Sequence, residues 1–288
     1  MKNAKAQYRR YTRSSWGNFF YFFFLILFGL FSVLPMVYTV CTSLKPLEEI
    51  LIFPPRFFVT RPVIDNYTAL PKLLSNLSVP LSRYIFNSLF VSVSTTVLHI
   101  FIASMAAFVI AKVKFKGSKT LFLLIQFALL YNAYTLAIPQ YVIFSKLNII
   151  DTYWVYILPY LPSTLGVFLV KQFIDSSKPD ALLEAGRIDG AGIFRIYYQI
   201  ALPIMKPAWL TLALFAFRDI WSMQPAGTIF SEELKMLPNI MSTISAGGIA
   251  RSGSAMAATV ILLIPPIIVY MVSQGSVMET MGSAGIKG

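Results

Sequence analysis

The stretch SKPDALLEAGRIDGAGIFRIYYQIALPIMKP, residues 177–207, is a polar segment between two strongly apolar ones. Ser177 with Asp180 three residues later predicts a helix N-terminus, capped by the Ser177 side chain. Asp189-Gly190 is a turn signal that ends this helix, and a second run of apolar residues at helical spacing follows. The stretch therefore predicts a helix-turn-helix elbow, and the rest of the chain is arranged on either side of it.

The first helix of this elbow is predicted to be short and amphipathic. Residues three and four positions apart share a face of a helix. The apolar side carries Ala181, Leu182, Ala185 and Ile188, and the charged side carries Asp180, Glu184 and Arg187. This pattern suits a docking element.

The composition indicates an integral membrane protein. Of 288 residues, 57% are hydrophobic and 12% are charged, against about 25% charged in ordinary soluble domains. One cysteine, Cys41, and one histidine, His99, exclude disulfides and multi-ligand His/Cys metal sites by number alone. The net charge of +12 does not indicate nucleic acid, because the basic residues are not gathered into one aromatic-rich surface.

The first apolar run, TM1, is predicted at 19–44, after a basic N-terminus at 1–18 that contains no acid. It is longer than the roughly 7–15 residues typical of a signal peptide, and no small-residue cleavage pattern follows it. We interpret it as an uncleaved membrane helix with a cytoplasmic N-terminus.

The remaining chain divides into an extracytoplasmic loop at 45–83, a five-helix core at 84–274 (TM2–TM6) and a cytoplasmic tail at 275–288. The core spans are predicted at about 84–111, 121–144, 155–173, 208–227 and 255–272, the last interrupted by Pro265-Pro266. On this topology 15 Lys and Arg residues lie on the cytoplasmic side and 8 outside. Because cytoplasmic loops carry the excess of Lys and Arg, both termini and the elbow are predicted to be cytoplasmic.

EAGRIDGAG (184–192) followed by IALPIMKP (200–207) resembles the EAA loop of binding-protein-dependent ABC importers. In that family the loop inserts into a groove of a separate ATPase subunit. The resemblance implies a coupling role for Glu184, Ala185, Gly186, Asp189, Gly190, Ala191, Leu202 and Pro203. Gly186 stands where the family usually has alanine, a change that costs about 1 kcal/mol in a helix.

RYIFNSLF (83–90), AAFVIAK (106–112) and IIDTYWVYILPY (149–160) are similar to sugar-permease subunits, in particular the smaller permease of maltose-type importers. The resemblance implies the all-α, six-helix fold of type I importer permeases, in a bacterial or archaeal plasma (inner) membrane. It also implies four partners: a second homologous permease, a dimer of cytoplasmic ATP-binding subunits, an extracytoplasmic solute-binding protein and a carbohydrate substrate. No phosphate-binding G-x-x-x-x-G-K-[ST] motif occurs in the chain, so we expect ATP-Mg on the ATPase subunit and no cofactor here.

Arg218 and Asp219 are ionisable residues inside a predicted span, where each costs at least about 2.5–3.5 kcal/mol. They could face the solute path or gate, or form a structural ion pair with the companion permease. Adjacent helical residues point about 100° apart, so we do not expect them to pair with each other. Gln126, Asn132 and Gln140 in the third span could line the path or bind helix to helix.

No Ser/His/acid or paired-carboxylate arrangement supports an enzyme, so we expect no catalytic residue and no metal. The sequence predicts a permease subunit of a carbohydrate importer, half of a heterodimeric pore for an oligosaccharide. Two alternatives stay open: an ABC permease for a peptide or amino acid, and a self-sufficient secondary transporter or channel. We expect His99 to be a packed, hydrogen-bonded residue, and Glu232 and Glu233 to be solvated.

Overall fold

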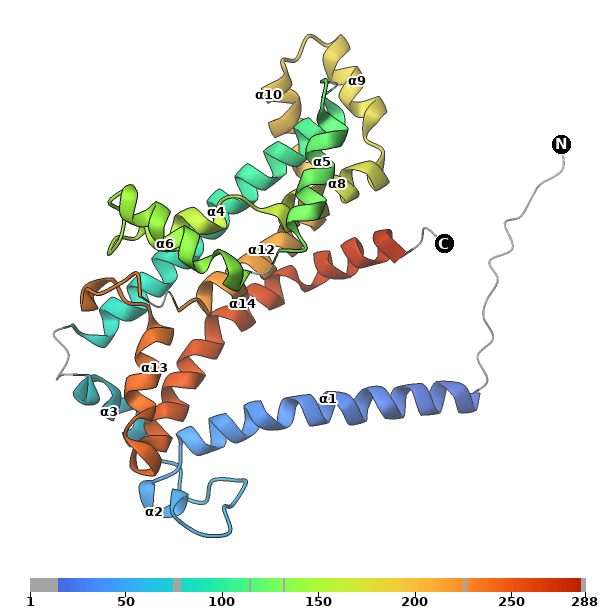
Figure 1. Cartoon of the computed structure of the whole chain (residues 1–288). Helices are drawn as coiled ribbons and strands as arrows, with labels where there is room; N and C mark the ends of the chain where they lie inside the picture. The colour runs from blue at the N-terminus through green and yellow to red at the C-terminus, as the bar shows by residue number, and fades with distance from the viewer. Residues whose placement is uncertain (1–14, 75–78, 114, 132, 225–226, 286–288) are drawn as a thin grey trace.

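The computed structural model describes residues 15–74, 79–113, 115–131, 133–224 and 227–285 (Figure 1). Within these ranges every regular element is a helix, in agreement with the predicted all-α class. The longer helices are α1 (Ser15–Ser43), α3 (Asp65–Leu73), α4 (Leu81–Lys112), α5 (Ser118–Ala128), α6 (Ala137–Lys146), α8 (Thr164–Ser177), α9 (Asp180–Ile188), α12 (Lys206–Trp221), α13 (Leu237–Ser245) and α14 (Ser252–Gly285). Short helices are α2 (Leu47–Ile50), α7 (Trp154–Ile157), α10 (Ile193–Ile196) and α11 (Leu202–Ile204), with a π-helical turn at Tyr197–Ala201 and 3₁₀ turns at Ala133–Leu136, Leu158–Tyr160, Glu232–Leu234 and Gly248–Arg251.

Four helical segments of the described residues are long and apolar enough to cross a membrane: Trp16–Ser43, Leu81–Lys112, Trp154–Ser177 and Gly248–Met278. A fifth is a pair of helices, Ile193–Ile204 and Lys206–Trp221, bent by 77°. The chain is therefore built to cross a membrane several times. Most of the predicted N-terminal segment at 1–18 lies outside the described residues.

The predicted third span, 121–144, is wrong as a single helix. It is divided into α5 and α6, with a 3₁₀ turn at Ala133–Leu136 between them. Pro139 lies in the first turn of α6, where its missing N–H costs no helical hydrogen bond. Pro139 therefore fits the beginning of a new helix, and it does not kink a continuous one.

The predicted interruption of the last span at Pro265-Pro266 is also wrong, since α14 is continuous through both prolines and includes most of the predicted tail. Pro266 has no N–H to donate to the Leu262 carbonyl four residues earlier. The indole nitrogen of Trp221, on α12, donates to that carbonyl oxygen over 3.0 Å. A neighbouring helix thus satisfies the carbonyl that the proline frees.

The elbow and the loop-rich part of the chain lie at opposite ends of the molecule (Figure 1). At one end, α9 and α10 pack on the ends of α4 and α8 through a core that contains Leu183, Ile196 and Met205. At the other, α3, α13 and α14 enclose a second core around Leu237 and Ile240. α4 runs between the two ends and contributes to both. α1 meets α14 near its own C-terminal end and then diverges from the bundle.

Candidate functional site

The elbow within 177–207 consists of α9, a tight turn and α10. Gly190 has a φ of +77°, a left-handed conformation that residues with a Cβ rarely adopt. The turn is closed by backbone bonds from Gly190 N to the Arg187 oxygen and from Ala191 N to the Gly186 oxygen, both 3.0 Å. α10 then continues into the π-helical turn and α11, which meets α12 at the bend.

The predicted N-terminal cap by Ser177 is wrong. α8 continues to Ser177, whose hydroxyl donates back to the Ile174 carbonyl oxygen over 3.3 Å. Lys178 takes a left-handed conformation with a φ of 45°, and α9 begins two residues later, at Asp180. The serine hydroxyl is therefore already engaged within the preceding helix.

Gly186 lies at a close approach inside the elbow. It is buried on the face of α9 that meets the second half of the elbow. A Cβ at this position would lie 2.7 Å from the Cδ1 of Ile200 and 3.6 Å from the Cγ1 of Ile196. The glycine therefore allows α9 to pack tightly against the π-helical turn, which offsets its lower helix propensity.

Two polar contacts fasten the elbow to α4. The hydroxyls of Ser104 and Tyr197 share a buried hydrogen bond of 2.7 Å. Lys112, the last residue of α4, forms an ion pair with Asp180, the first residue of α9, with 2.7 Å between Nζ and Oδ1. These two contacts join the elbow directly to a long helix of the core, α4, which has 32 residues.

The outer surface of the elbow is apolar and exposed. Ile188 is 82% exposed and Phe194 76% exposed, and Leu182 and Tyr198 are also exposed. Among the other implied coupling residues, Glu184, Ala185, Asp189 and Pro203 are exposed, whereas Ala191 and Leu202 are half-buried against the core. The apolar side predicted for α9 therefore points away from the protein's own core.

Arg218 and Asp219 lie near the end of α12 with 71% and 57% of their side chains exposed. The expectation that these neighbours do not pair is wrong, since Arg218 Nε lies 3.9 Å from Asp219 Oδ1. The long arginine side chain reaches back across the angle between the two positions. An exposed pair at this distance contributes little stability in water, and neither side chain is covered by the described residues.

The polar residues of the divided third span lie on two different helices. Gln126 on α5 and Gln140 on α6 are half-buried, and Asn132 lies outside the described residues. His99 on α4 is buried, and its Nδ1 contacts the carbonyl oxygen of Tyr160. Because a carbonyl oxygen only accepts, that ring nitrogen is the donor, and the prediction of a packed, hydrogen-bonded histidine is confirmed.

α4 also carries a row of buried hydroxyls that the sequence prediction missed. Within the described residues, Ser92 Oγ, Thr95 Oγ1 and Thr96 Oγ1 are buried and have no hydrogen-bond partner. Their spacing of three and four positions could have been recognised from the sequence, because it places them on one face of a helix. The interior face of α4 is consequently polar through the middle of its length.

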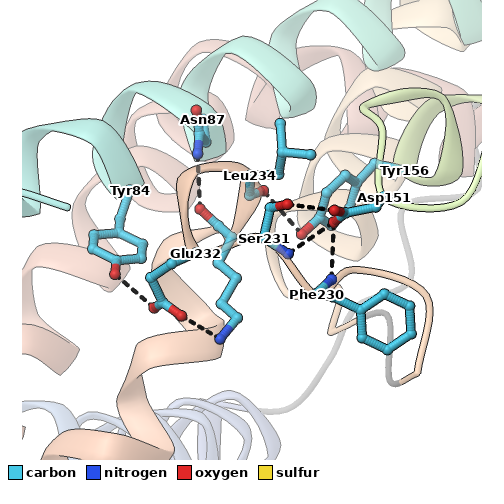
Figure 2. Close-up of polar contacts among 9 residues, drawn as sticks. Tyr84, Asn87, Asp151, Tyr156, Phe230, Ser231, Glu232 and Leu234 are labelled. Carbon is cyan, nitrogen blue, oxygen red and sulfur yellow. Dashed lines mark hydrogen bonds and ion pairs between the residues drawn. The ribbon is translucent and has the colours of Figure 1, made fainter. Parts of the chain in front are cut away.

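At the opposite end of the molecule, a polar network holds the loop that follows α12 (Figure 2). The Asn87 amide nitrogen donates to the carbonyl oxygens of Glu233 (2.7 Å) and Lys235 (2.9 Å). The Asp151 carboxylate accepts from the backbone nitrogens of Phe230 (2.9 Å) and Ser231 (2.8 Å), and also from the Ser231 hydroxyl. Side chains from α4 and from the loop before α7 thus fix residues 230–235.

The prediction that Glu232 is simply solvated is wrong. It accepts a 2.6 Å hydrogen bond from the Tyr84 hydroxyl and pairs with Lys235. Burial opposes ionisation, but the bonds from Lys235 and Tyr84 hold the pKa of Glu232 below its ordinary value. The bonds from Ser231 and Phe230 likewise lower the pKa of Asp151. Both carboxylates are therefore charged anchors of the loop at neutral pH.

The comparisons with known proteins agree with this architecture. No family model matches the chain. It is 28% identical over 269 residues to the arabinooligosaccharides transport system permease protein of Bacillus subtilis, covering 92% of this chain and 94% of that protein. It is 31% identical over 205 residues to the sn-glycerol-3-phosphate transport system permease protein of Yersinia enterocolitica, covering 70% and 73%.

Among solved structures, the chain is similar to a crystal structure of a bacterial ABC transporter involved in the import of the acidic polysaccharide alginate. The TM-score is 0.74 at 22% identity, over 91% of this chain and 98% of that one. The fold is therefore that of an ABC transporter permease chain.

The chain belongs to the permease subunits of ABC transporters. Of the two relatives described above, one is named for arabinooligosaccharides and the other for sn-glycerol-3-phosphate. It is a multi-pass membrane protein that serves transport, as its relatives do, and no enzymatic activity is implied.

Proposed function

We propose that this chain is one half of a heterodimeric pore that imports an oligosaccharide, driven by a separate cytoplasmic ATPase. The observation that carries the proposal is the elbow: an exposed apolar surface on α9 and α10 that is fastened to α4 by Lys112–Asp180 and Ser104–Tyr197. An exposed apolar patch rimmed by polar residues marks an interaction site. The ATPase subunit, which carries ATP-Mg, would dock on this surface.

A second permease subunit would cover Arg218 and Asp219. Their exposed charges lie on a helix that is apolar enough to belong to a membrane span, and charged groups in lipid are costly. A companion subunit or a water-filled path between two subunits removes that cost. The residues would then contribute to the path or gate, together with Gln126, Gln140 and Asn132.

The oligosaccharide assignment rests on two similar proteins. One transports arabinooligosaccharides, and the structurally similar alginate transporter has also been solved with an alginate pentasaccharide-bound periplasmic protein. We propose that an extracytoplasmic binding protein delivers the solute here as well. The relative that carries sn-glycerol-3-phosphate makes a small phosphorylated solute the second candidate.

The decisive experiment is purification of the chain from its native membrane, with identification of the subunits that accompany it. We expect an ATP-binding subunit, a second permease and solute-stimulated ATP hydrolysis after reconstitution with the binding protein. Stimulation by oligosaccharides but not by glycerol phosphate would support the substrate class. Uptake by the purified chain alone would instead indicate a secondary transporter or channel.

The proposed orientation places both termini and the elbow inside a bacterial or archaeal plasma membrane. In a background without Cys41, an external thiol reagent should label a cysteine at Ile249, which is exposed at the outer end. It should not label cysteines at Lys119 or Arg195, near the elbow. Equal labelling at all three positions in intact cells would contradict the orientation.

A further inference from the structure

An apolar pocket of about 390 Å³ is lined by residues of α4, α5 and α10, beside the elbow. Its walls include Met105, Ala106, Val109, Leu121 and Phe194. All of the lining side chains are apolar or aromatic, and Phe194 is 76% exposed at its edge. The pocket lies toward the end of α4 that terminates at Lys112, so it belongs to the boundary region of a membrane-crossing helix.

A second, basic pocket of about 740 Å³ adjoins the first, and the two share Ile110 and Phe115. Lys116, Lys119 and Lys171 line the basic pocket. Lys116 and Lys119 flank the start of α5, after the end of α4, and Lys171 lies on α8. The two pockets therefore place an apolar wall and a positively charged wall side by side.

The lysines differ in how far their charges are already neutralised. Lys171 is paired with Asp175, with 2.6 Å between Nζ and Oδ2, and lies 4.2 Å from the ring centre of Phe122. In the part of the chain that the structure describes, Lys116 and Lys119 are exposed and take part in none of the ion pairs. The basic pocket thus keeps two uncompensated positive charges.

We propose that the joined pockets bind one anionic phospholipid, with the phosphate at Lys116 and Lys119 and an acyl chain against Ala106 and Ile193. Basic pockets between membrane helices recognise anionic head groups, and each lysine near the membrane surface adds to the attraction. An apolar slot alone would not distinguish lipid from a protein side chain. The positive charges of Lys116 and Lys119 beside the apolar slot favour a lipid with an anionic head group. The bound lipid would brace α10, and hence the elbow, against α4.

The test uses the full-length chain with its subunits retained, stripped of lipid in detergent and examined by native mass spectrometry. Phosphatidylglycerol and phosphatidylcholine with identical acyl chains are added back separately. We expect one tightly retained phosphatidylglycerol, and on the order of tenfold weaker retention of it after Lys116→Gln with Lys119→Gln. Lys178→Gln with Lys206→Gln, two exposed lysines outside the pockets, is the matched control and should retain the lipid.

A second pair of variants tests the apolar part. Ala106→Phe fills the slot and should lower retention of phosphatidylglycerol, whereas Ala128→Phe, exposed on α5 outside the pocket, should not. Competition by inorganic phosphate as effective as that by the lipid would show a phosphate site and overturn the proposal. Equal retention of phosphatidylglycerol and phosphatidylcholine in every variant would also overturn the proposal. So would loss of the preference for phosphatidylglycerol when the ATPase subunit is bound. Retention is measured without transport, so this outcome is independent of the proposed import function.

Discussion

The two ends of the molecule are stabilised in different ways. At the end opposite the elbow, residues 230–235, the outer loop of the proposed orientation, are held by Asn87, Asp151 and Tyr84 through bonds to backbone and to charged groups (Figure 2). At the elbow, two polar contacts join the surface element to α4, and large apolar side chains remain exposed. The outer loop is thus held by contacts within the chain, whereas the exposed apolar surface of the elbow is the one that we propose a partner covers.

This contrast predicts that substitutions at the elbow act on assembly and coupling, and that those in the outer loop act on local order. On the proposed orientation, a rigid outer loop would keep a fixed surface toward the proposed extracytoplasmic binding protein. If the proposed ATPase subunit moves the elbow, the contacts of Lys112 and Tyr197 would carry that movement to α4. The predictions below run from the elbow to the outer loop, in decreasing order of the expected effect on transport.

Gly190→Val should have the largest effect, because valine resists the φ of +77° that closes the turn between α9 and α10. We expect solute-stimulated ATP hydrolysis of the reconstituted complex to fall more than tenfold, with membrane insertion unchanged. Gly192→Val is the control: Gly192 has a φ of −66° and no atom near its missing Cβ. If both variants couple as the wild type does, the elbow is only a connector.

Glu184→Lys should weaken binding of the ATPase subunit, because it places a positive charge on the exposed charged side of α9 where a carboxylate could meet a basic partner. We expect about tenfold less ATPase subunit retained during purification. Glu184→Gln, which removes the charge without reversing it, should give an intermediate loss. Retention equal to wild type in both variants would place the docking surface elsewhere.

Much of the elbow could be predicted from local sequence, because a turn at Asp189-Gly190 and a helical apolar period are local signals. What could not be predicted depends on neighbours. Whether Pro265-Pro266 breaks a helix is decided by Trp221 on another helix, which satisfies the freed carbonyl. The anchoring of Glu232 depends on Tyr84, 148 positions away.

The charged residues of α12 also show that local sequence does not determine which side chains make contact. The sequence correctly marks Arg218 and Asp219 as unusual, but the angle between adjacent side chains is a poor guide when one of them is a long arginine. The break in the third span was missed because hydropathy alone does not distinguish one long helix from two short ones. The role of all these residues in the path stays a prediction.

Arg218→Ala and Asp219→Ala should each lower transport several-fold while the ATPase subunit stays bound, because each variant leaves one charge unpaired in the span. If the residues matter mainly by neutralising each other, the double alanine variant should recover part of the loss. Transport is measured in reconstituted vesicles at matched protein levels. Wild-type rates in both single variants would show that the charges are incidental.

Asp151→Asn should affect transport least, about twofold or less, but should loosen the outer loop. The carboxylate accepts bonds from Phe230 and Ser231, and hydrogen bonds to a charged group contribute about 1.5–3 kcal/mol. Because the pKa of Asp151 is lowered in the folded protein, this stabilisation is present above the unfolded pKa of about 3.9 and is lost as pH falls below it.

Amide hydrogen exchange at Phe230 and Ser231, corrected for its intrinsic pH dependence, should therefore rise in the wild type below about pH 4. In Asp151→Asn it should be fast at every pH, by about 10- to 100-fold at neutral pH. Slow, pH-independent exchange in both proteins would show that other contacts hold the loop, and that the contrast between the two ends rests on the elbow alone.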